Sequence, residues 1–392
     1  MPYLDHAATS PVRPDVIDAM ARAQADTGNA SAVHASGRRA RRRVEESREA
    51  IAEALDARPS EVVFTSGGTE SDNLAVKGLF WARRAADPAR VRVLVGATEH
   101  HAVHDAVDWL ATHEGGKRVE VAADPSGVVT PEAFAAALGH DSSDVALATV
   151  MWANNEIGTI SPVADLAALA HEHGVLFHTD AVQALATQPV SFARSGVDAM
   201  AVTGHKLGGP CGVGALVLRR ELDCEPLLHG GGQERDVRSG TLDVASIVGL
   251  ATAVTAAVAD RAALTARLEA LRTRLLDGLR AQVPDLVVNG HPTQRLPGLL
   301  HVSFPGCEGD AVLMLLDAAG VECSTGSACN AGVSEPSAVL LALGASLQVA
   351  RGSVRFSLGH TSTEADVDAA VAAIGPAVER ARKAAATMAE RS

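Results

Sequence analysis

The 392-residue sequence is poor in aromatic residues and in cysteine. Only 3% of its residues are aromatic, whereas 47% are hydrophobic, with alanine, valine and leucine prominent. Small aliphatic side chains suit helices packed on a parallel sheet, so we expect an α/β fold. Five cysteines are an odd number in a large chain, which argues against a disulfide framework and favours a reduced, cytoplasmic setting.

The chain also lacks an excess of positive charge. Its formal net charge is −13 at pH 7, which opposes non-specific binding to nucleic acid or to an anionic membrane. No basic patch with interleaved aromatic residues counters this charge. The arginine-rich run 38–43 is better explained as the solvated face of a helix that turns Val44, Ile51 and Leu55 inward.

Long apolar runs are missing as well. The longest uncharged apolar segment, Val244–Ala259, has 16 residues and contains serine and threonine, so it falls short of a membrane span. The N-terminus lacks the charged start and apolar stretch of a signal peptide. The chain length predicts one large and one smaller domain. We place an N-terminal arm at 1–12, a large domain at 13–258 and a small domain at 259–392.

Two nucleotide-binding motifs, G-x-x-x-x-G-K-[ST] and G-x-G-x-x-G, are absent. Residues 61–73 instead predict a strand, a turn at Gly67 and Gly68, and the start of a helix. Backbone amides at a helix start bind phosphate well, and glycine lets the backbone approach a ligand closely. An ordinary capped turn explains the same residues equally well.

Two polar clusters each follow a short apolar run. His178–Gln183 follows Val175–Phe177, and Thr203–Lys206 follows Ala199–Val202; runs this short predict buried strands. Ligands of α/β sheets gather outside the carboxyl ends of such strands. A lysine there can form an imine with an aldehyde, and an aspartate can hold a protonated ring nitrogen, as pyridoxal phosphate (PLP) chemistry requires. The alternatives are a solvated loop lysine and an aspartate that caps a helix.

Further polar residues follow two more predicted strands, 91–95 and 145–151. His100 follows the first strand and could ligate a metal together with His104, but no H-E-x-x-H motif and no third ligand accompany them. We therefore expect no metal site, and a histidine stacked on a cofactor ring is the better hypothesis for His100. Asn155 follows the second strand, at the edge where a site is expected.

Together these segments resemble the IscS/NifS type of cysteine desulfurase, a PLP enzyme of aminotransferase fold type I, class V. They occur in the order that the family has, and they span nearly the whole chain. The resemblance implies a mostly parallel central sheet flanked by helices, with a smaller α+β C-terminal domain. The matching segments are Tyr3–Thr9, Phe64–Asn73, Thr98–His100, Asn154–Gly158, His178–Gln183, Gly204–Lys206, Gly230–Thr241, Gly326–Cys329 and Arg355–Gly359.

The resemblance also implies how the cofactor is held. Lys206 would carry PLP as a Schiff base and, once displaced by substrate, would move the Cα proton. Asp180 would keep the ring nitrogen protonated, and His100, a catalytic residue by the same resemblance, would stack on the ring and could shuttle protons. Hydrogen bonds to the phenolic oxygen would come from Gln183 and Asn155. The phosphate would be held by Gly68, Thr69, Thr203 and His205, and by Thr241 across the interface of a homodimer.

The nucleophile that the resemblance implies is Cys329, in a run of small polar residues typical of a mobile loop, about 323–337. Its thiolate would attack the sulfur of L-cysteine and give alanine and a persulfide. Arg355 would pair with the substrate carboxylate, with Asn29 and Asn155 adding contacts. A loop of this length would let the persulfide travel to an acceptor protein.

The other four cysteines carry separate predictions. Cys224 and Cys307 are expected to be buried hydrophobic side chains. Cys323 departs from the family pattern; we expect it in a strand and buried, with a resolving thiol as the alternative. Cys211 stands where family members can carry lysine, and we find no physical reason for that change.

The resemblance implies L-cysteine as the substrate and a sulfur-acceptor protein as a partner, either an iron–sulfur scaffold or a tRNA-thiolation enzyme. No direct nucleic-acid or membrane partner is expected. A selenocysteine lyase, another fold type I enzyme such as an aminotransferase, and a catalytically idle PLP-bearing scaffold are the alternatives. The sequence leaves open which acceptor is used and whether Cys329 helps to ligate a shared cluster.

Overall fold

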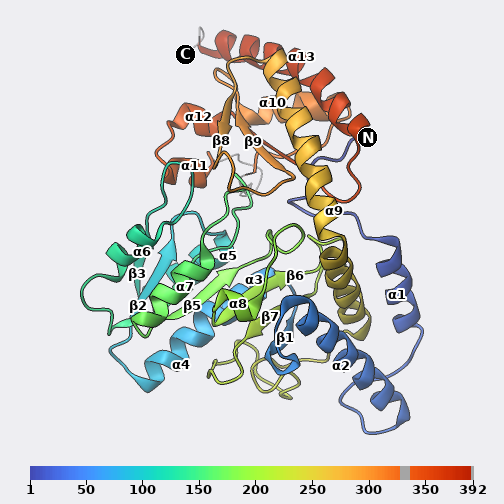
Figure 1. Ribbon diagram of the computed structural model, residues 1–392, viewed down its shortest axis with the longest axis vertical. Helices are drawn as coiled ribbons and strands as arrows, with labels where there is room; N and C mark the ends of the chain where they lie inside the picture. Colours follow the sequence, from blue (N-terminus) through green and yellow to red (C-terminus); the bar gives the residue numbers. More distant parts are fainter. Residues whose placement is uncertain (327–335, 390–392) are drawn as a thin grey trace.

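The computed structural model describes residues 1–326 and 336–389, which build two sheets connected by one long helix. Figure 1 shows the larger sheet in the lower half of the view and the smaller sheet in the upper half. Helix α9 (Val244–Gln282) runs alongside both.

The larger sheet has seven strands in the order β1-β7-β6-β5-β4-β2-β3. Six strands run parallel to one another, and β7 is antiparallel to both of its neighbours. Strands β1, β4, β6 and β7 are buried along their whole length, as expected for a sheet covered on both faces. The strands are β1 Val62–Thr65, β2 Arg92–Gly96, β3 Lys117–Val121, β4 Val145–Thr149, β5 Leu176–Asp180, β6 Ala199–Thr203 and β7 Gly214–Leu218.

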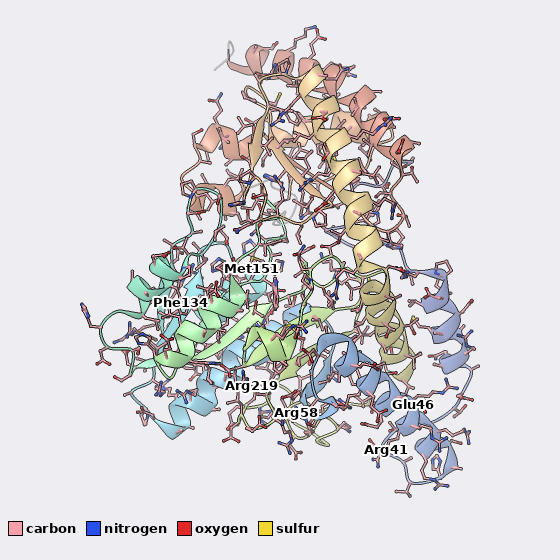
Figure 2. All side chains as sticks on the ribbon, in the orientation of Figure 1. Arg41, Glu46, Arg58, Phe134, Met151 and Arg219 are labelled. Carbon is pink, nitrogen blue, oxygen red and sulfur yellow. The ribbon has the colours of Figure 1, made fainter. Side chains whose placement is uncertain are left out.

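Two apolar clusters cover the two faces of this sheet. One includes Phe134, labelled in Figure 2, whose ring centroid lies 5.8 Å from that of Phe177 on β5. The other includes Leu79 and Phe80. The predicted mostly parallel sheet with flanking helices is therefore confirmed. The helices of this part are α1 Pro14–Gln24, α2 Ala35–Leu55, α3 Gly68–Asn73, α4 Leu79–Ala86, α5 His101–His113, α6 Pro131–Leu138, α7 Val163–Glu172 and α8 Phe192–Ser195.

Helix α2 is the predicted arginine-rich helix. Its Val44, Ile51 and Leu55 are buried, while Arg38 and Arg41 are exposed, so the amphipathic pattern was interpreted correctly. The arginine run therefore lies on the solvent-exposed face of an amphipathic helix.

The smaller sheet is antiparallel, in the order β10-β9-β8, and packs against helices that include the second half of α9. Its core includes Leu271 and Leu275 of α9, Phe304 and Phe356. This is the smaller α+β unit that the resemblance implied. The elements are β8 Val287–Asn289, β9 Leu299–Ser303, α10 Gly309–Ala318, α11 Ala338–Ala342, α12 Leu347–Arg351, β10 Ser353–Ser357 and α13 Glu364–Ala389.

Helix α9 contributes to both cores: Leu250 packs in the larger one and Leu271 in the smaller one. The domain boundary predicted between residues 258 and 259 falls inside this helix and stays a prediction. Within residues 1–326 and 336–389, α9 is the one helix long and apolar enough to cross a membrane, judged by length and composition only. Because 44% of its apolar window is buried inside the protein, it is weak support for a membrane span.

The N-terminal arm ties the two parts together. The backbone N–H of Leu4 donates to Glu322, and the N–H of Ser357 on β10 donates to the carbonyl of Leu4. Farther along, Ser10 N–H donates to the carbonyl of His205, just after β6. The arm therefore crosses from the small sheet to the carboxyl edge of the large one.

Candidate active site

Polar side chains gather where the parallel strands of the large sheet end. Asp180 is the last residue of β5 and Thr203 the last of β6, and these strands are hydrogen-bonded neighbours. Lys206 follows three residues after Thr203. Parallel strands end at the same edge of the sheet, and alternate side chains along a strand point to the same face. Residues that lie far apart in the sequence therefore come together at this edge.

Lys206 lies under the N-terminal arm. Its Nζ donates to the backbone carbonyl of Ala8, at 2.8 Å, and to that of Ala7. Burial is the main reason why the pKa of Lys206 falls to about 8, and the nearby Arg355 lowers it further. A lysine with this pKa is partly uncharged near neutral pH, the form that reacts with an aldehyde.

Asp180 is a buried carboxylate with an exposed fraction of 6%. Its Oδ1 accepts a hydrogen bond from the backbone N–H of Val182, at 2.8 Å. Burial is the main reason why the pKa of Asp180 rises to about 7; the neighbouring Asp72 carboxyl group acts in the same direction and His100 in the opposite one. A buried carboxylate of this kind gains most from a cationic partner.

His100 caps the N-terminus of α5. Its Nδ1 accepts a hydrogen bond from the backbone N–H of Ala102, at 3.1 Å. The proton of the neutral ring is therefore on Nε2. Burial lowers the pKa of His100, while the Asp180 charge opposes that change, so the imidazole is held neutral close to this carboxylate.

The predicted phosphate turn has the backbone that close approach requires. Gly67 adopts φ +153°, and a Cβ on Gly68 would lie 2.9 Å from a methyl of Val182. Gly67 also faces the hydroxyl of Thr203, since an added Cβ would lie 3.8 Å from Thr203 Oγ1. Thr69, in the first turn of α3, is exposed.

Residues of the same edge complete the predicted cofactor set. Gln183 Nε2 donates to the carbonyl of Ala7, at 2.8 Å. His205 Nδ1 lies 3.3 Å from Thr9 Oγ1, and burial lowers the pKa of His205 to about 4. Asn155 is half-buried, and its backbone carbonyl accepts a hydrogen bond from Arg355.

The residues present fit PLP. Asp180 supplies a buried carboxyl group, which a cationic partner would stabilise in its charged form, and Lys206 is partly uncharged near neutral pH. At the Gly67–Gly68 turn, an added Cβ on Gly67 would lie 3.8 Å from Thr203 Oγ1, so the turn and this hydroxyl group face the same space. These residues match the ring nitrogen, the aldehyde and the phosphate of that cofactor.

Arg355 approaches the same place from β10 of the small sheet. Its Nη1 donates to the carbonyl of Asn155 and its Nη2 to Asp5 Oδ1, both at 2.8 Å. Its Nε is buried and has no hydrogen-bond partner within the described part of the chain. The guanidinium therefore keeps a donor free for an anion.

Cys329 belongs to the segment 327–335, outside the described residues, so its predicted role is untested by the structure. The residues on either side of that segment, Gly326 and Ser337, lie near the candidate site. A Cβ on Gly326 would lie 3.5 Å from the Cβ of Arg355. On the other side, Ser337 Oγ donates to the buried Glu156, at 2.6 Å. The segment thus joins the described chain close to Arg355 and Asn155.

Two predicted site residues lie apart from this group. Asn29 is exposed and its Oδ1 accepts from Ser31 N–H, at 2.9 Å. Thr241 is exposed in the segment between β7 and α9. Neither is hydrogen-bonded to the described residues around Lys206.

The cysteine predictions have mixed outcomes. Cys307 is buried, as predicted, whereas Cys224 is only half-buried and the prediction was wrong. Cys224 packs against the outside of the apolar cluster that includes Leu79 and Phe80, and its Sγ donates to the carbonyl of Leu74, at 3.5 Å. Cys323 is half-buried close to Arg355 and belongs to no strand, so that prediction was also wrong; it lies between two isolated bridges, Tyr3–Glu322 and Ser324–Arg355, which leave it at the surface of the small sheet's edge.

Sequence reasoning missed several residues of this site. Asp5 and the carbonyls of Ala7 and Ala8 hold Arg355 and Lys206. The arm segment was recognised, but no sequence pattern shows that its backbone turns toward Lys206. Asp72 and His178 were also missed, although His178 precedes Asp180 by two residues on a strand and so shares its face.

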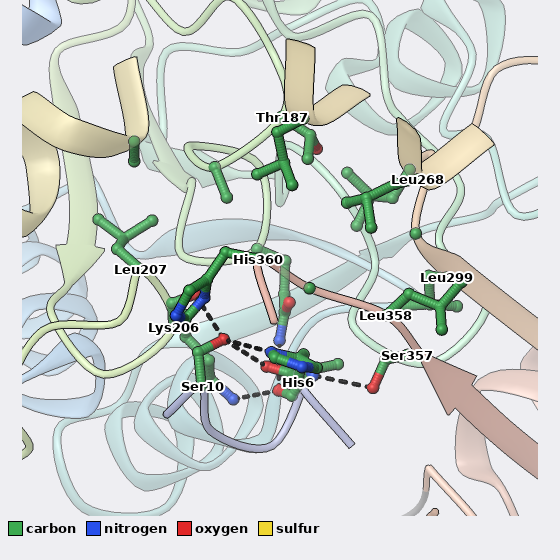
Figure 3. A pocket seen from close by; sticks show the side chains of 18 of the residues that line it. His6, Ser10, Thr187, Lys206, Leu207, Leu268, Leu299, Ser357, Leu358 and His360 are labelled. Carbon is green, nitrogen blue, oxygen red and sulfur yellow. Dashed lines mark hydrogen bonds between the residues drawn. The ribbon is translucent and has the colours of Figure 1, made fainter. Parts of the chain in front are cut away.

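A pocket of about 670 Å³ of empty space adjoins Lys206 (Figure 3). Lys206 and Gln183 line it on one side, with His6 and Ser10 of the N-terminal arm. Leu268 and Leu299 line the opposite side. The pocket therefore lies between the two cores, next to the predicted cofactor lysine.

Within the described residues, no group of three or more histidine, cysteine or acidic side chains could hold a metal ion. His100 and His104 accordingly have no third histidine, cysteine or acidic ligand among those residues.

Comparison with known proteins identifies the family. The family model for aminotransferase class-V matches residues 2–370. An IscS-like cysteine desulfurase of Mycobacterium tuberculosis is 58% identical over 387 residues, 98% of this chain and 98% of that protein. Among solved structures, a NifS-like protein has a TM-score of 0.89 at 33% identity, covering 96% of this chain and 99% of that chain. The structure of SspA in complex with cysteine has a TM-score of 0.79 at 32% identity, covering 92% and 99%. The chain therefore belongs to the aminotransferase class-V family, among the cysteine desulfurases of the IscS/NifS type.

Proposed function

We propose that this cysteine desulfurase holds PLP on Lys206 and uses Cys329 to take the sulfur of L-cysteine, leaving L-alanine. The observation that carries the proposal is the pairing of a buried Asp180 with a low-pKa Lys206 at the ends of neighbouring strands. When bound, PLP supplies an electron sink for negative charge at the substrate Cα. The similarity to a structure solved in complex with cysteine supports L-cysteine as the substrate.

The protein's own side chains would then divide the work. Asp180 would bind the ring nitrogen and stabilise its protonated form. The phosphate would be held by Gly68, Thr69, Thr203 and His205. Lys206 has a pKa of about 8, so its amine can accept the Cα proton near neutral pH.

Four more side chains orient the reactants. His100 stacks on the ring, with its proton on Nε2. Gln183 and Asn155 bind the phenolic oxygen. The free donor of Arg355 binds the substrate carboxylate, with Asn29 and Asn155 adding contacts.

Sulfur transfer to Cys329 balances without an outside oxidant. The Cys329 thiolate attacks the substrate sulfur, so an S–S bond forms while the Cβ–S bond breaks. The electron pair of the broken bond stays on carbon, which takes up a proton to give alanine. The persulfide then passes to an acceptor protein; an iron–sulfur scaffold and a tRNA-thiolation enzyme are the partners we propose.

Replacing Cys329 tests this assignment. Cys329→Ala should abolish sulfide release from L-cysteine but leave PLP bound, because the nucleophile alone is lost. Cys211→Ala, which removes an exposed thiol, is the matched control and should keep full activity. Full sulfide release by the Cys329 variant would refute its role. Alanine produced without any added keto acid would exclude an aminotransferase.

We also propose a homodimer in which Thr241 binds the phosphate in the site of the partner subunit. Its side chain is exposed and has no hydrogen bond to the described residues around Lys206, which supports this role. Mixed dimers of Lys206→Ala and Thr241→Ala chains test it, because one of their two sites regains both residues. Activity above that of either parent is expected, and its absence would contradict the proposal.

We further propose a cytoplasmic setting, which the free thiols of Cys211, Cys224, Cys307 and Cys323 support.

A further inference from the structure

Three acidic side chains lie buried close together at the carboxyl edge of the large sheet. Asp180 ends β5, Asp72 lies on α3, and Glu99 lies just before α5. The charge of Asp72 acts on Asp180, and both act on Glu99. Carboxyl groups that are buried close together cannot all be ionised, because the negative charge of each one disfavours ionisation of the others.

No lysine or arginine within 4 Å neutralises Asp72 or Glu99 in the described residues. The one ion-pairing neighbour of Asp72 there is His178, with Oδ1 and Nε2 3.5 Å apart. Both atoms are fully buried, and neither accepts or donates a hydrogen bond within the described residues. Glu99 Oε1 accepts from the backbone N–H of Met151, and its Oε2 is equally buried and unpaired. A buried anion without a cation is costly, so these contacts favour uncharged groups.

The other nitrogen of His178 completes the arrangement. Nδ1 lies 2.9 Å from Thr149 Oγ1 on β4. Burial lowers the pKa of His178 to about 4 and raises that of Asp72 to about 8, so near neutral pH one proton remains on each group. The pairing that satisfies both ring nitrogens has Asp72 donating to Nε2 and Nδ1 donating to Thr149.

We propose that Asp72 and His178 are positioning residues that form an uncharged, hydrogen-bonded pair and, with a protonated Glu99, leave Asp180 as the one charged carboxylate of this group. The inference rests on the proposed function, because the cation that Asp180 meets is the PLP ring nitrogen. One anion then faces one cation. A second anion at Asp72 would leave the region with an excess negative charge that burial does not tolerate.

Infrared spectroscopy of the full-length, PLP-loaded protein tests the proton on Asp72. Ordinary aspartates, with a pKa of about 3.9, have lost the carbonyl band of the protonated acid well below pH 7. We expect part of that band to persist at pH 7 and to decrease in Asp72→Asn. Asp108→Asn, at an exposed aspartate paired with Arg118, is the matched control and should leave it unchanged. A band in Asp72→Asn equal to that of the unsubstituted protein would overturn the proposal, as would its absence from the unsubstituted protein at pH 7.

A second measurement uses the pH dependence of the visible absorbance of bound PLP. The titratable groups that interact electrostatically with Asp180 are Asp72, Glu99, His178, His100 and Lys206. If Asp72 is uncharged, Asp72→Asn should leave the pH midpoint of the absorbance change where it is in the unsubstituted protein. Asp180→Asn, which removes the negative charge beside the cofactor, should lower that midpoint. A fall of about one pH unit in Asp72→Asn would show that Asp72 is charged and would overturn the inference alone. Failure of the unsubstituted protein to bind PLP would instead overturn the proposed function, and the inference with it.

Discussion

At the scale of single residues, burial sets the chemistry of the candidate site. It lowers the pKa of Lys206 to about 8 and raises that of Asp180 to about 7, so both groups titrate near neutral pH. In water a lysine titrates at about 10.4 and an aspartate at about 3.9. Groups with a pKa near the working pH exchange protons most effectively. A cationic ring nitrogen would restore the charge of Asp180 by direct pairing.

Replacing Arg355 with lysine should weaken substrate binding. Lysine keeps the positive charge but loses the planar set of donors that now binds Asn155 and Asp5 and leaves Nε free. We expect KM for L-cysteine to rise roughly 10- to 100-fold, with a smaller change in kcat. Steady-state kinetics measures both values.

Arg274→Lys is the control for that variant. Arg274 makes a similar two-point contact with Asp368, but on the exposed surface. Its replacement should leave KM unchanged. An unchanged KM in Arg355→Lys would show that this guanidinium does not bind the substrate.

The sequence predicted Lys206 and Asp180 because each follows a short apolar run at a fixed, recognisable spacing. It did not predict Asp72 and His178, because their contact joins α3 to β5 across about a hundred residues of chain and depends on how the helix packs. Thr149, from a third element, completes that group. Interactions of this kind follow from packing and carry no local pattern.

At the scale of elements, two ion pairs hold the segment between β7 and α9: Arg238–Glu70 and the more deeply buried Arg48–Glu234. Glu234 accepts from Arg48 Nη2 at 2.7 Å and Nη1 at 2.8 Å, and from the backbone N–H of Phe64 at 2.9 Å. The next two residues, Arg235 and Asp236, have φ of +55° and +62°, a conformation that costs about 1 kcal/mol or more each. The buried Glu234 contacts offset that cost and fix the segment that carries Thr241.

Glu234→Gln should loosen this segment. The amide keeps the shape but leaves Arg48 without its buried counter-charge, and breaking such a pair costs about 3 kcal/mol. Urea unfolding should show the loss, and PLP should dissociate more readily because Thr241 is no longer held. Glu45→Gln, which alters an exposed partner of the same Arg48, should cost at most about 0.5 kcal/mol. If Glu234→Gln and Glu45→Gln lowered the free energy of unfolding by the same small amount, this account would be contradicted.

Strands β4, β5 and β6 could be predicted to within a few residues, since each is an apolar run ended by polar residues. The reversed direction of β7 could not. Its run of apolar residues is compatible with either direction, and the direction is set by the short turn around Gly208 and Gly212, both at positive φ.

At the scale of the whole molecule, two cores share α9 and the N-terminal arm, and many histidines are buried in the neutral form. Burial lowers the pKa of His6, His178 and His205 to about 4 and that of His301 to about 3. Below about pH 6.5 the unfolded chain binds protons that the folded chain does not, so acid should favour unfolding.

The cofactor-free protein should therefore be most stable near pH 6.5. The raised pKa values of Asp72 and Asp180, about 8 and about 7, act in the opposite sense: the folded state keeps protons that the unfolded state has released, and stability falls as pH rises toward 8. The two aspartates contribute a loss of roughly 1–3 kcal/mol between pH 6.5 and 8, which the remaining titration of the histidines in the unfolded chain reduces but does not reverse. Urea unfolding across this pH range measures it. A free energy of unfolding that continues to rise up to pH 8 would contradict the assignment.

The central claim is that the sulfur of L-cysteine moves to Cys329 while PLP is bound at Lys206. Mass spectrometry of the PLP-loaded protein after brief exposure to L-cysteine tests it most directly. The account predicts one extra sulfur atom on the peptide that contains Cys329, lost on treatment with a thiol reductant and absent from Lys206→Ala. Extra sulfur on the peptides of Cys211 or Cys323 instead, or on none, would contradict it.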